Sequence, residues 1–197
     1  MKKLFFFFLF LTSWYVLHAQ GVRSMFILTS AKVDINGTTN VNKFNCSLHE
    51  SNLSDTLYLA GEWEGNTIVL DGLDLKLTVN KFDCGIKLMT NDFRKIMMSE
   101  TYPDILLKIN RLVVTSEMKR DSTYSVSTEA LFSIAKATRR EDIKNGALRN
   151  LHDKQVISGS HHVKMTSFGL TPPTKFFGTV KVADELSLEF ELVLEHQ

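Results

Sequence analysis

The chain has 197 residues, a formal net charge of +1 and two cysteines. This length fits one domain with a sizeable core, even after removal of a short leader. A near-neutral balance provides no electrostatic field for nucleic acid or acidic membranes, and no run of lysine or arginine alternates with aromatic residues as in a nucleic-acid groove. We therefore expect no nucleic-acid partner.

The first stretch has the layout of a secretory signal peptide. Lys2 and Lys3 precede an apolar run over 4–11, and a second apolar run leads to Ala19-Gln20. We predict cleavage after Ala19, which makes 1–19 a signal peptide and 20–197 the mature domain, located in the periplasm or secreted. The alternative is an uncleaved membrane anchor, but the apolar run is shorter than the ~20 residues that a membrane span needs. We expect no stable membrane span after cleavage.

Extended segments follow one another through the first part of the mature chain. We predict strands over 25–35 and 41–50, and then a hairpin of 55–62 and 66–70. These stretches are rich in Ile, Phe, Val and Leu, and Gly and Asn turn residues separate them. Short strands at such regular spacing favour an antiparallel barrel or sandwich over a parallel sheet.

The stretch 73–114 has the pattern of a strand, a short helix and a second strand. Apolar and polar residues alternate over 73–79, which predicts a half-buried strand. The residues 90–92 supply N-cap chemistry for a helix predicted over 93–98. The return strand has Leu112 on its outer face and these residues on its inner face: Ile105, Leu107, Ile109 and Val113. We interpret this stretch as one corner of an antiparallel barrel, with the helix at an open end.

The last part of the chain again predicts strands, over 124–134, 156–165, 176–182 and 186–194. In the final strand apolar residues alternate with polar ones almost without exception. A slip of one residue would bury three glutamates, so the register is firmly specified.

The segment 139–154 is highly charged and its structure is less clearly specified. Ile143, Ala147, Leu148 and Leu151 lie at helical spacing, but Gly146 weakens a helix and no cap or proline fixes its ends. We predict a solvated hairpin or a loose helix. The alternative is an element that docks a partner.

The two cysteines end two nearly identical phrases. These are Val41-Asn42-Lys43-Phe44-Asn45-Cys46 and Val79-Asn80-Lys81-Phe82-Asp83-Cys84. In an oxidising compartment Cys46 and Cys84 are candidates for a disulfide, which would stabilise the fold by roughly 3 to 4 kcal/mol. The alternative is two separate buried thiols that pack as small apolar side chains.

The sequence contains no motif for reaction chemistry. Ser158-Gly159-Ser160-His161-His162 lacks the strand-to-helix elbow of a hydrolase, and two adjacent histidines on a strand point to opposite faces, so they do not share one metal ion. We also find no metal-ligand spacing and no phosphate loop. We predict a protein without catalytic residues, metal or cofactor; an enzyme acting on a lipid head group is an alternative.

Three separated motifs resemble one known family. They are 82–105, which begins with Phe82-Asp83-Cys84 and ends with Tyr102-Pro103-Asp104-Ile105; the stretch 130–139; and Met165-Thr166-Ser167-Phe168-Gly169-Leu170-Thr171-Pro172-Pro173. In this order they resemble the YceI-like family, lipocalin-like proteins that bind polyisoprenoid lipids. The resemblance implies an all-β fold, a lipocalin-like antiparallel β-barrel of about eight strands with one or two short helices. It also implies an exported, non-catalytic protein with a bound polyisoprenoid or fatty lipid.

Such a protein would hold the apolar chain among inward-facing side chains. Our candidates for ligand binding are Leu75, Leu77, Phe82, Leu107, Ile109, Phe132, Ile134, Phe176, Leu188 and Phe190. Each buried methylene contributes roughly 0.8 kcal/mol, so a long prenyl chain can exceed the ~4 to 15 kcal/mol cost of association. Periodicity does not distinguish a lined tunnel from a solid core, so a ligand-free structural or interaction module with a filled barrel is the alternative. Both are compatible with a homodimer.

Overall fold

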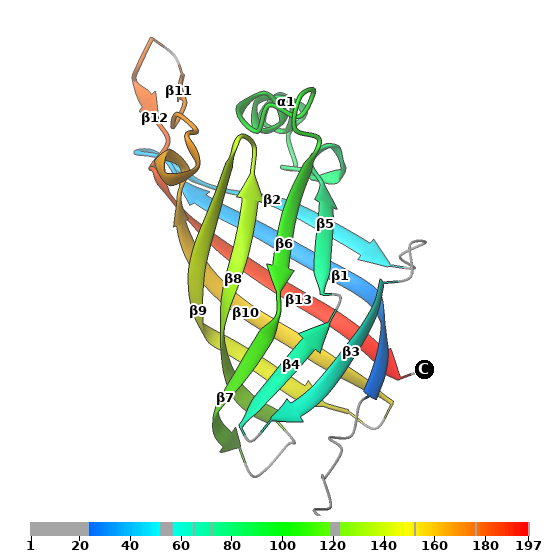
Figure 1. Cartoon of the computed structure of the whole chain (residues 1–197). Helices are drawn as coiled ribbons and strands as arrows, with labels where there is room; N and C mark the ends of the chain where they lie inside the picture. Colours follow the sequence, from blue (N-terminus) through cyan, green and yellow to red (C-terminus); the bar gives the residue numbers. More distant parts are fainter. Residues whose placement is uncertain are drawn as a thin grey trace, which may run out of the picture.

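The computed structural model describes residues 24–51, 57–64, 66–71, 73–118, 123–151, 153–175 and 177–196. These residues form antiparallel strands with a few short helices (Figure 1). The elements are β1 (Ser24–Thr38), β2 (Lys43–Ser51), β3 (Leu57–Glu64), β4 (Thr67–Asp71), β5 (Asp74–Thr78), η1 (Val79–Lys81), α1 (Lys87–Ile96), β6 (Asp104–Ile109), β7 (Arg111–Met118), β8 (Thr123–Ile134), β9 (Ala137–Asn150), β10 (Lys154–Lys164), η2 (Met165–Phe168), β11 (Thr174–Lys175), β12 (Val180–Lys181) and β13 (Glu185–His196). The predicted signal peptide, 1–19, lies outside the described residues.

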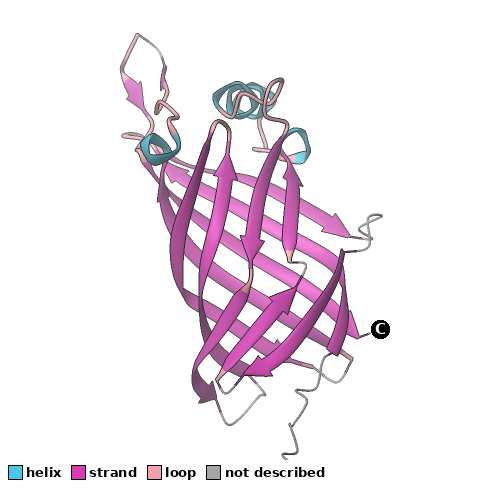
Figure 2. Cartoon of the chain, in the orientation of Figure 1, coloured by secondary structure: helices cyan, strands magenta, loops and turns pink. Residues whose placement is uncertain are grey.

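The strands curl into a closed barrel. Hydrogen-bonded pairs run in the order β8, β7, β4, β3, β1, β13, β10 and β9, and β9 pairs with β8 to complete the ring. Three further strands extend this ring toward one end. β6 pairs with β8, β5 pairs with β6, and β2 pairs with β1. Figure 2 shows α1 and the short helices gathered at that end, which we call the α1 end. The predicted lipocalin-like antiparallel barrel of about eight strands is confirmed.

No helix within the described ranges is long and apolar enough to cross a membrane.

The register of β13 follows from its alternation. It pairs with β1 on one side and with β10 on the other, along nearly its whole length. Leu192 and Leu194 are buried in the interior, whereas Glu189, Glu191 and Glu195 are exposed. Burying any of these carboxylates would require a partner that the apolar interior does not offer.

Asn110 divides the predicted return strand into β6 and β7. The Leu70 N–H donates to the Asn110 carbonyl at 2.7 Å, outside the regular ladder. One residue, Asn110, lies between the two strands, so the inward and outward faces exchange beyond it. Leu112 is therefore 2 % exposed, whereas Val113 is only half-buried. The prediction that Leu112 lies on the outer face is therefore wrong.

The charged segment 139–154 is mostly strand, so the prediction of a loose helix is wrong. The prediction of a solvated hairpin is confirmed in outline, because many side chains of the segment are exposed and β9 pairs antiparallel with β10, the strand that follows it. It lies largely in β9, which pairs with β8 along one edge and with β10 along the other. Gly146 is needed there, because a Cβ at this position would lie 2.9 Å from both Val126 Cγ2 and the Val126 carbonyl oxygen. Pairing on both edges outweighs the weak local preference for helix. A partner could reach only the outer face of this segment.

Helix α1 begins earlier than the sequence predicts. Its N-cap is Ile86, which makes no side-chain capping bond, so 90–92 lie inside the helix and do not cap it. Thr90 has another role: its hydroxyl accepts from the Cys84 N–H at 3.0 Å and donates to Asp83 Oδ1 at 3.1 Å. The bonds hold the start of α1 against the segment that precedes it.

The predicted strand over 176–182 is replaced by a small hairpin. β11 and β12 form a separate two-stranded sheet with a turn over 177–179. Val180 pairs with Lys175 inside this hairpin, and Val182 forms an isolated bridge with Thr39, so these residues do not continue the strands of the barrel.

A disulfide links two strand edges at the α1 end. Within the described part of the chain, β5 pairs only with β6 and β2 only with β1, which leaves a gap in the ladder between β2 and β5. Cys46 of β2 is bonded to Cys84, 38 residues along the chain. Beside it the backbones of Ser47 and Asp83 exchange two hydrogen bonds of 2.8 and 2.9 Å. The candidate pair of cysteines thus forms the disulfide that joins these two edges.

Candidate functional site

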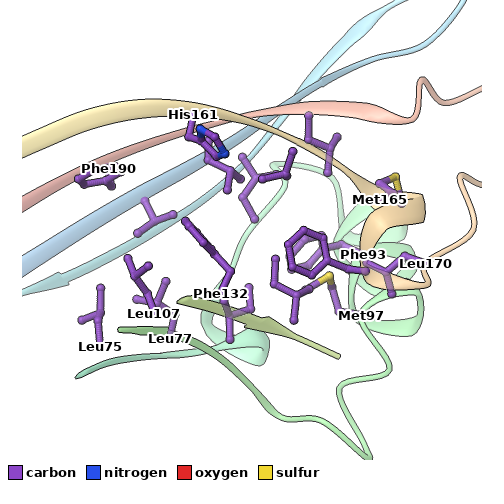
Figure 3. A pocket seen from close by; sticks show the side chains of 18 residues that line it. Leu75, Leu77, Phe93, Met97, Leu107, Phe132, His161, Met165, Leu170 and Phe190 are labelled. Atoms are coloured by element: carbon purple, nitrogen blue, oxygen red, sulfur yellow. The ribbon is translucent and has the colours of Figure 1, made fainter. Parts of the chain in front are cut away.

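The barrel contains an apolar cavity next to α1, which we call the barrel pocket. Its volume is about 70 Å³. Strands β1, β5, β6, β8, β10 and β13 supply its walls, and residues of α1 and η2 cover its end (Figure 3). Among the described residues, all lining side chains are apolar except that of His161.

The half of the interior away from α1 is filled. Its side chains are at most 2 % exposed and none of them lines the pocket: Leu28, Ile109, Leu112, Ile143, Leu148, Leu192 and Leu194. Further toward the α1 end of β13, Leu186, Leu188 and Phe190 are only half-buried and line the pocket. The strand therefore passes from pocket wall to solid core between Phe190 and Leu192.

The structure brings most of the predicted ligand-binding residues together. Those that line the barrel pocket are Leu75, Leu77, Leu107, Phe132, Ile134, Leu188 and Phe190. Ile109 lies in the filled half, and Phe82 packs against the Phe93 ring at 5.4 Å between centroids without lining the pocket. Phe176 lies outside the described residues. Whether any of these side chains binds a ligand stays a prediction.

Sequence reasoning missed the residues that cover the pocket. Phe93 and Met97 of α1 lie one turn apart and point inward, and Met165 and Leu170 reach the pocket from η2 and the loop after it (Figure 3). The apolar spacing of Phe93 and Met97 was a detectable signal, but the sequence did not indicate which space the helix covers. Methionine side chains adapt easily to irregular spaces, so this cover can repack.

The carboxylate of Asp184 helps to hold η2 in place. Asp184 accepts hydrogen bonds from the Thr166 hydroxyl at 2.7 Å and from the Thr166 N–H at 2.9 Å. Both bonds lower the pKa of Asp184 below its ordinary value, and the bond from the hydroxyl has the larger effect. The carboxylate therefore stays ionised and anchors η2 over the pocket.

His161 is the polar residue that the described part of the chain contributes to the pocket wall. Its Nε2 lies 3.1 Å from Glu141 Oε2, and its ring stacks on Phe132 with centroids 6.2 Å apart. His162 points the other way and is exposed, 3.6 Å from Glu185 Oε1, so the two histidines lie on opposite faces as their spacing predicts. No group of metal-ligating side chains occurs among the described residues.

The site can exclude water from an apolar group, and it offers little else. An engineered apolar cavity of about 150 Å³ accepts benzene, so the barrel pocket in this arrangement has room for only a few carbon atoms. A longer chain requires the cover formed by Phe93, Met97 and Met165 to move outward.

Comparisons with known proteins bear on the fold. No protein-family model matches the sequence, and no curated protein matches it. Among solved structures, a polyisoprenoid binding domain from Saccharophagus degradans implicated in plant cell wall breakdown has a TM-score of 0.61 at 11 % identity. The match covers 87 % of this chain and 98 % of that domain.

Two further structures agree. BcnA of Burkholderia cenocepacia has a TM-score of 0.50 at 17 % identity, covering 83 % of this chain and 95 % of that one. A mutant YceI protein of Campylobacter jejuni has a TM-score of 0.51 at 11 % identity, covering 71 % of this chain and 80 % of that one. At these identities the likeness concerns the fold. The resemblance seen in the sequence is confirmed at that level: this chain has the YceI-like fold, a lipocalin-like barrel.

Proposed function

We propose that this protein belongs to the YceI-like family and is an exported, non-catalytic lipid-binding protein. It holds the apolar chain of a polyisoprenoid or a similar lipid in the barrel pocket. The observation that carries the proposal is the apolar cavity between half-buried side chains of β13 and the cover from α1. The choice of ligand is supported by the Saccharophagus degradans domain, which is described as polyisoprenoid binding and has the same fold.

The energetics require the pocket to enlarge. At roughly 0.8 kcal/mol per buried carbon group, one five-carbon isoprene unit contributes about 4 kcal/mol. Association costs about 4 to 15 kcal/mol, so several units must be buried for stable binding. The cavity of about 70 Å³ is too small for these units. The bound chain therefore displaces the side chains of the cover, mainly Met97 and Met165, without disturbing the filled half.

The proposed location is the periplasm or the exterior of the cell. Two observations support export: the layout of 1–19 and the Cys46–Cys84 disulfide, since disulfides persist in oxidising compartments. A homodimer stays a prediction.

Solvent extraction tests the proposal. Full-length protein is expressed with its leader, purified from the compartment it reaches, extracted with organic solvent and analysed by mass spectrometry. We expect one apolar chain per protein molecule. An extract without such a chain, from folded protein, would contradict the proposal.

A matched pair of variants tests the location of the chain. Leu188→Trp adds bulk to the barrel pocket, whereas Leu131→Trp adds the same bulk on the exposed outer face of β8. We expect the ratio of chain to protein to fall at least about fivefold in Leu188→Trp only, because the added ring occupies the space that the chain needs. Thermal melts followed by circular dichroism establish that both variants are folded. Equal ratios in the two variants would place the chain elsewhere.

One observation favours the second candidate function, a ligand-free module with a filled barrel. The small volume of the pocket is what a nearly solid interior leaves behind. This candidate predicts an empty extract and no thermal stabilisation by an added C20 prenyl alcohol. The lipid-binding proposal predicts stabilisation, since a ligand that binds only the folded state raises its stability.

A further inference from the structure

The most exposed large apolar side chains of the described residues gather at the α1 end. Val41, Ile86 and Leu88 are 68, 61 and 69 % exposed, and Phe177 is fully exposed. They lie in three segments far apart in the sequence: the turn 39–42, the start of α1 over 86–88, and the hairpin 174–181 (Figure 1). We call these three segments together the rim. Leu106, Leu131 and Leu151, the other exposed large apolar residues described, are each less than half exposed.

Polar contacts hold the rim together as one surface. The Asn40 side chain donates to the Thr179 carbonyl at 2.8 Å and accepts from the Lys181 N–H at 2.9 Å, which joins the turn to the hairpin. Lys175 Nζ lies 2.9 Å from Asp92 Oδ2, which joins the hairpin to α1. The exposed apolar side chains thus belong to a connected platform around the end of the barrel.

The rim and the residues beside it carry positive charge. Four exposed lysines have no acidic partner within the described part of the chain: Lys43, Lys87, Lys95 and Lys181. Of the nearby carboxylates, Asp92 pairs with Lys175. Asp83 accepts hydrogen bonds from Thr90 and Gly85 but keeps its negative charge, and Glu100 is also exposed, so the four lysines outnumber these two acids.

The barrel pocket lies at the same end. Its cover is made by α1 and η2, and the rim surrounds this cover. A chain that enters the pocket through this cover therefore arrives from the side on which the apolar and basic side chains are exposed.

We propose that the rim docks the protein on a membrane surface that carries anionic lipid headgroups. Exposed apolar side chains next to lysines suit the boundary between headgroups and acyl chains, where each lysine near an anionic surface adds attraction. Phe177 inserts at this boundary, and the lysines contact the headgroups. The purpose of docking, delivery of a chain to the pocket, rests on the proposed function.

Vesicle binding of the full chain tests docking. Vesicles of phosphatidylcholine and phosphatidylglycerol at a ratio of 3 to 1 are compared with pure phosphatidylcholine by co-sedimentation. We expect Phe177→Ser to weaken binding to the anionic vesicles at least about tenfold, as loss of one buried phenyl ring predicts. Lys87→Gln and Lys181→Gln should each weaken it about fivefold.

The controls make equivalent changes on the barrel wall. Leu106→Ser removes an exposed apolar side chain of β6, and Lys144→Gln removes an exposed lysine of β9. Both should bind vesicles like the wild type. Absence of binding to anionic vesicles overturns the proposal, and so do equal losses in rim and wall variants. The docking proposal is also overturned if the rim binds another protein but does not bind vesicles.

Extraction of the same variants separates docking from lipid carriage. Protein that contains an apolar chain but binds no vesicle overturns docking and leaves the proposed function intact. Protein that binds anionic vesicles through Phe177 but contains no chain supports docking and contradicts the proposed function.

Discussion

Two leucines of β13 show how position along one strand decides what a side chain does. Leu192 is 0 % exposed and packs in the filled half, whereas Leu188, four residues earlier on the same face, lines the barrel pocket. Both are inward-facing residues of one type on one strand. They differ only in whether neighbours surround them on all sides.

This difference predicts unequal costs of truncation. Leu192→Ala should lower the free energy of unfolding by about 2 to 5 kcal/mol, the range for a leucine removed from a packed core. Leu188→Ala should cost less than about 2 kcal/mol, because open space already lies beside it and fewer contacts are lost. Urea unfolding of both variants measures these costs. Equal losses would mean that the pocket is as tightly packed as the core.

The inward faces of the site could be predicted from the sequence, but its extent could not. Alternation correctly placed Leu75, Leu107 and Phe132 in the interior. It could not separate Ile109 from Leu107, because both lie on one face of β6 and only the packing of distant strands fills the space around Ile109. The cover residue Met97 was missed because its apolar spacing from Phe93 shows which face of the helix is buried but not which space that face covers.

At the scale of elements, the α1 end depends on a covalent link. The ladder is interrupted between β2 and β5, and the Cys46–Cys84 disulfide with the Ser47–Asp83 pair connects the two edges. The same link fixes the chain just before α1. The start of the helix is thus tethered covalently, whereas its last turn is held by packing and by the Arg94 guanidinium, which donates to the Asn80 carbonyl at 2.7 Å.

Removal of the disulfide should therefore destabilise the protein. For a loop of 38 residues the chain-entropy model gives roughly 3 to 4 kcal/mol. We expect the double variant Cys46→Ser, Cys84→Ser to lose this amount in guanidinium unfolding. Reduced wild-type protein serves as the control and should match it. Unchanged stability in both would show that the Ser47–Asp83 contact alone closes the gap.

Elements with strong periodicity were predicted well, and those defined by tertiary pairing were not. The alternation in β8 and β13 identified both strands. The segment that forms β9 lacks such alternation, and its conformation is fixed by β8 and β10 on either side. The change of face at Asn110 follows from a break at which its carbonyl accepts from the Leu70 N–H, 40 positions earlier in the chain.

At the scale of the whole molecule, the distribution of charge matters more than its sum. A net charge of +1 predicts no attraction to acidic membranes. The fold nevertheless brings Lys43, Lys87 and Lys181 to one end, from segments that are distant in the sequence. The overall barrel could be predicted from alternation and from the resemblance of three motifs, but this grouping depends on the closure of the ring.

Hydrogen exchange should reveal two levels of local stability. Strands β1, β10 and β13 each pair on both sides, while β5 pairs only with β6 within the described residues. We expect the slowest amide exchange in β10 and β13, and exchange at least tenfold faster in β5 and α1, since local opening there breaks fewer contacts. Mass-spectrometric exchange on peptides from these elements measures this. Uniform protection would mean that the barrel opens only as a unit.

The passage from open space to solid packing midway along β13 has an evolutionary consequence. Residues near Leu192 keep the strands in register whatever the region around Leu188 contains. Selection can therefore change the side chains of the open region while the packed region maintains the fold. Such a separation of tasks allows one architecture to persist among chains that share only 11 to 17 % of their residues.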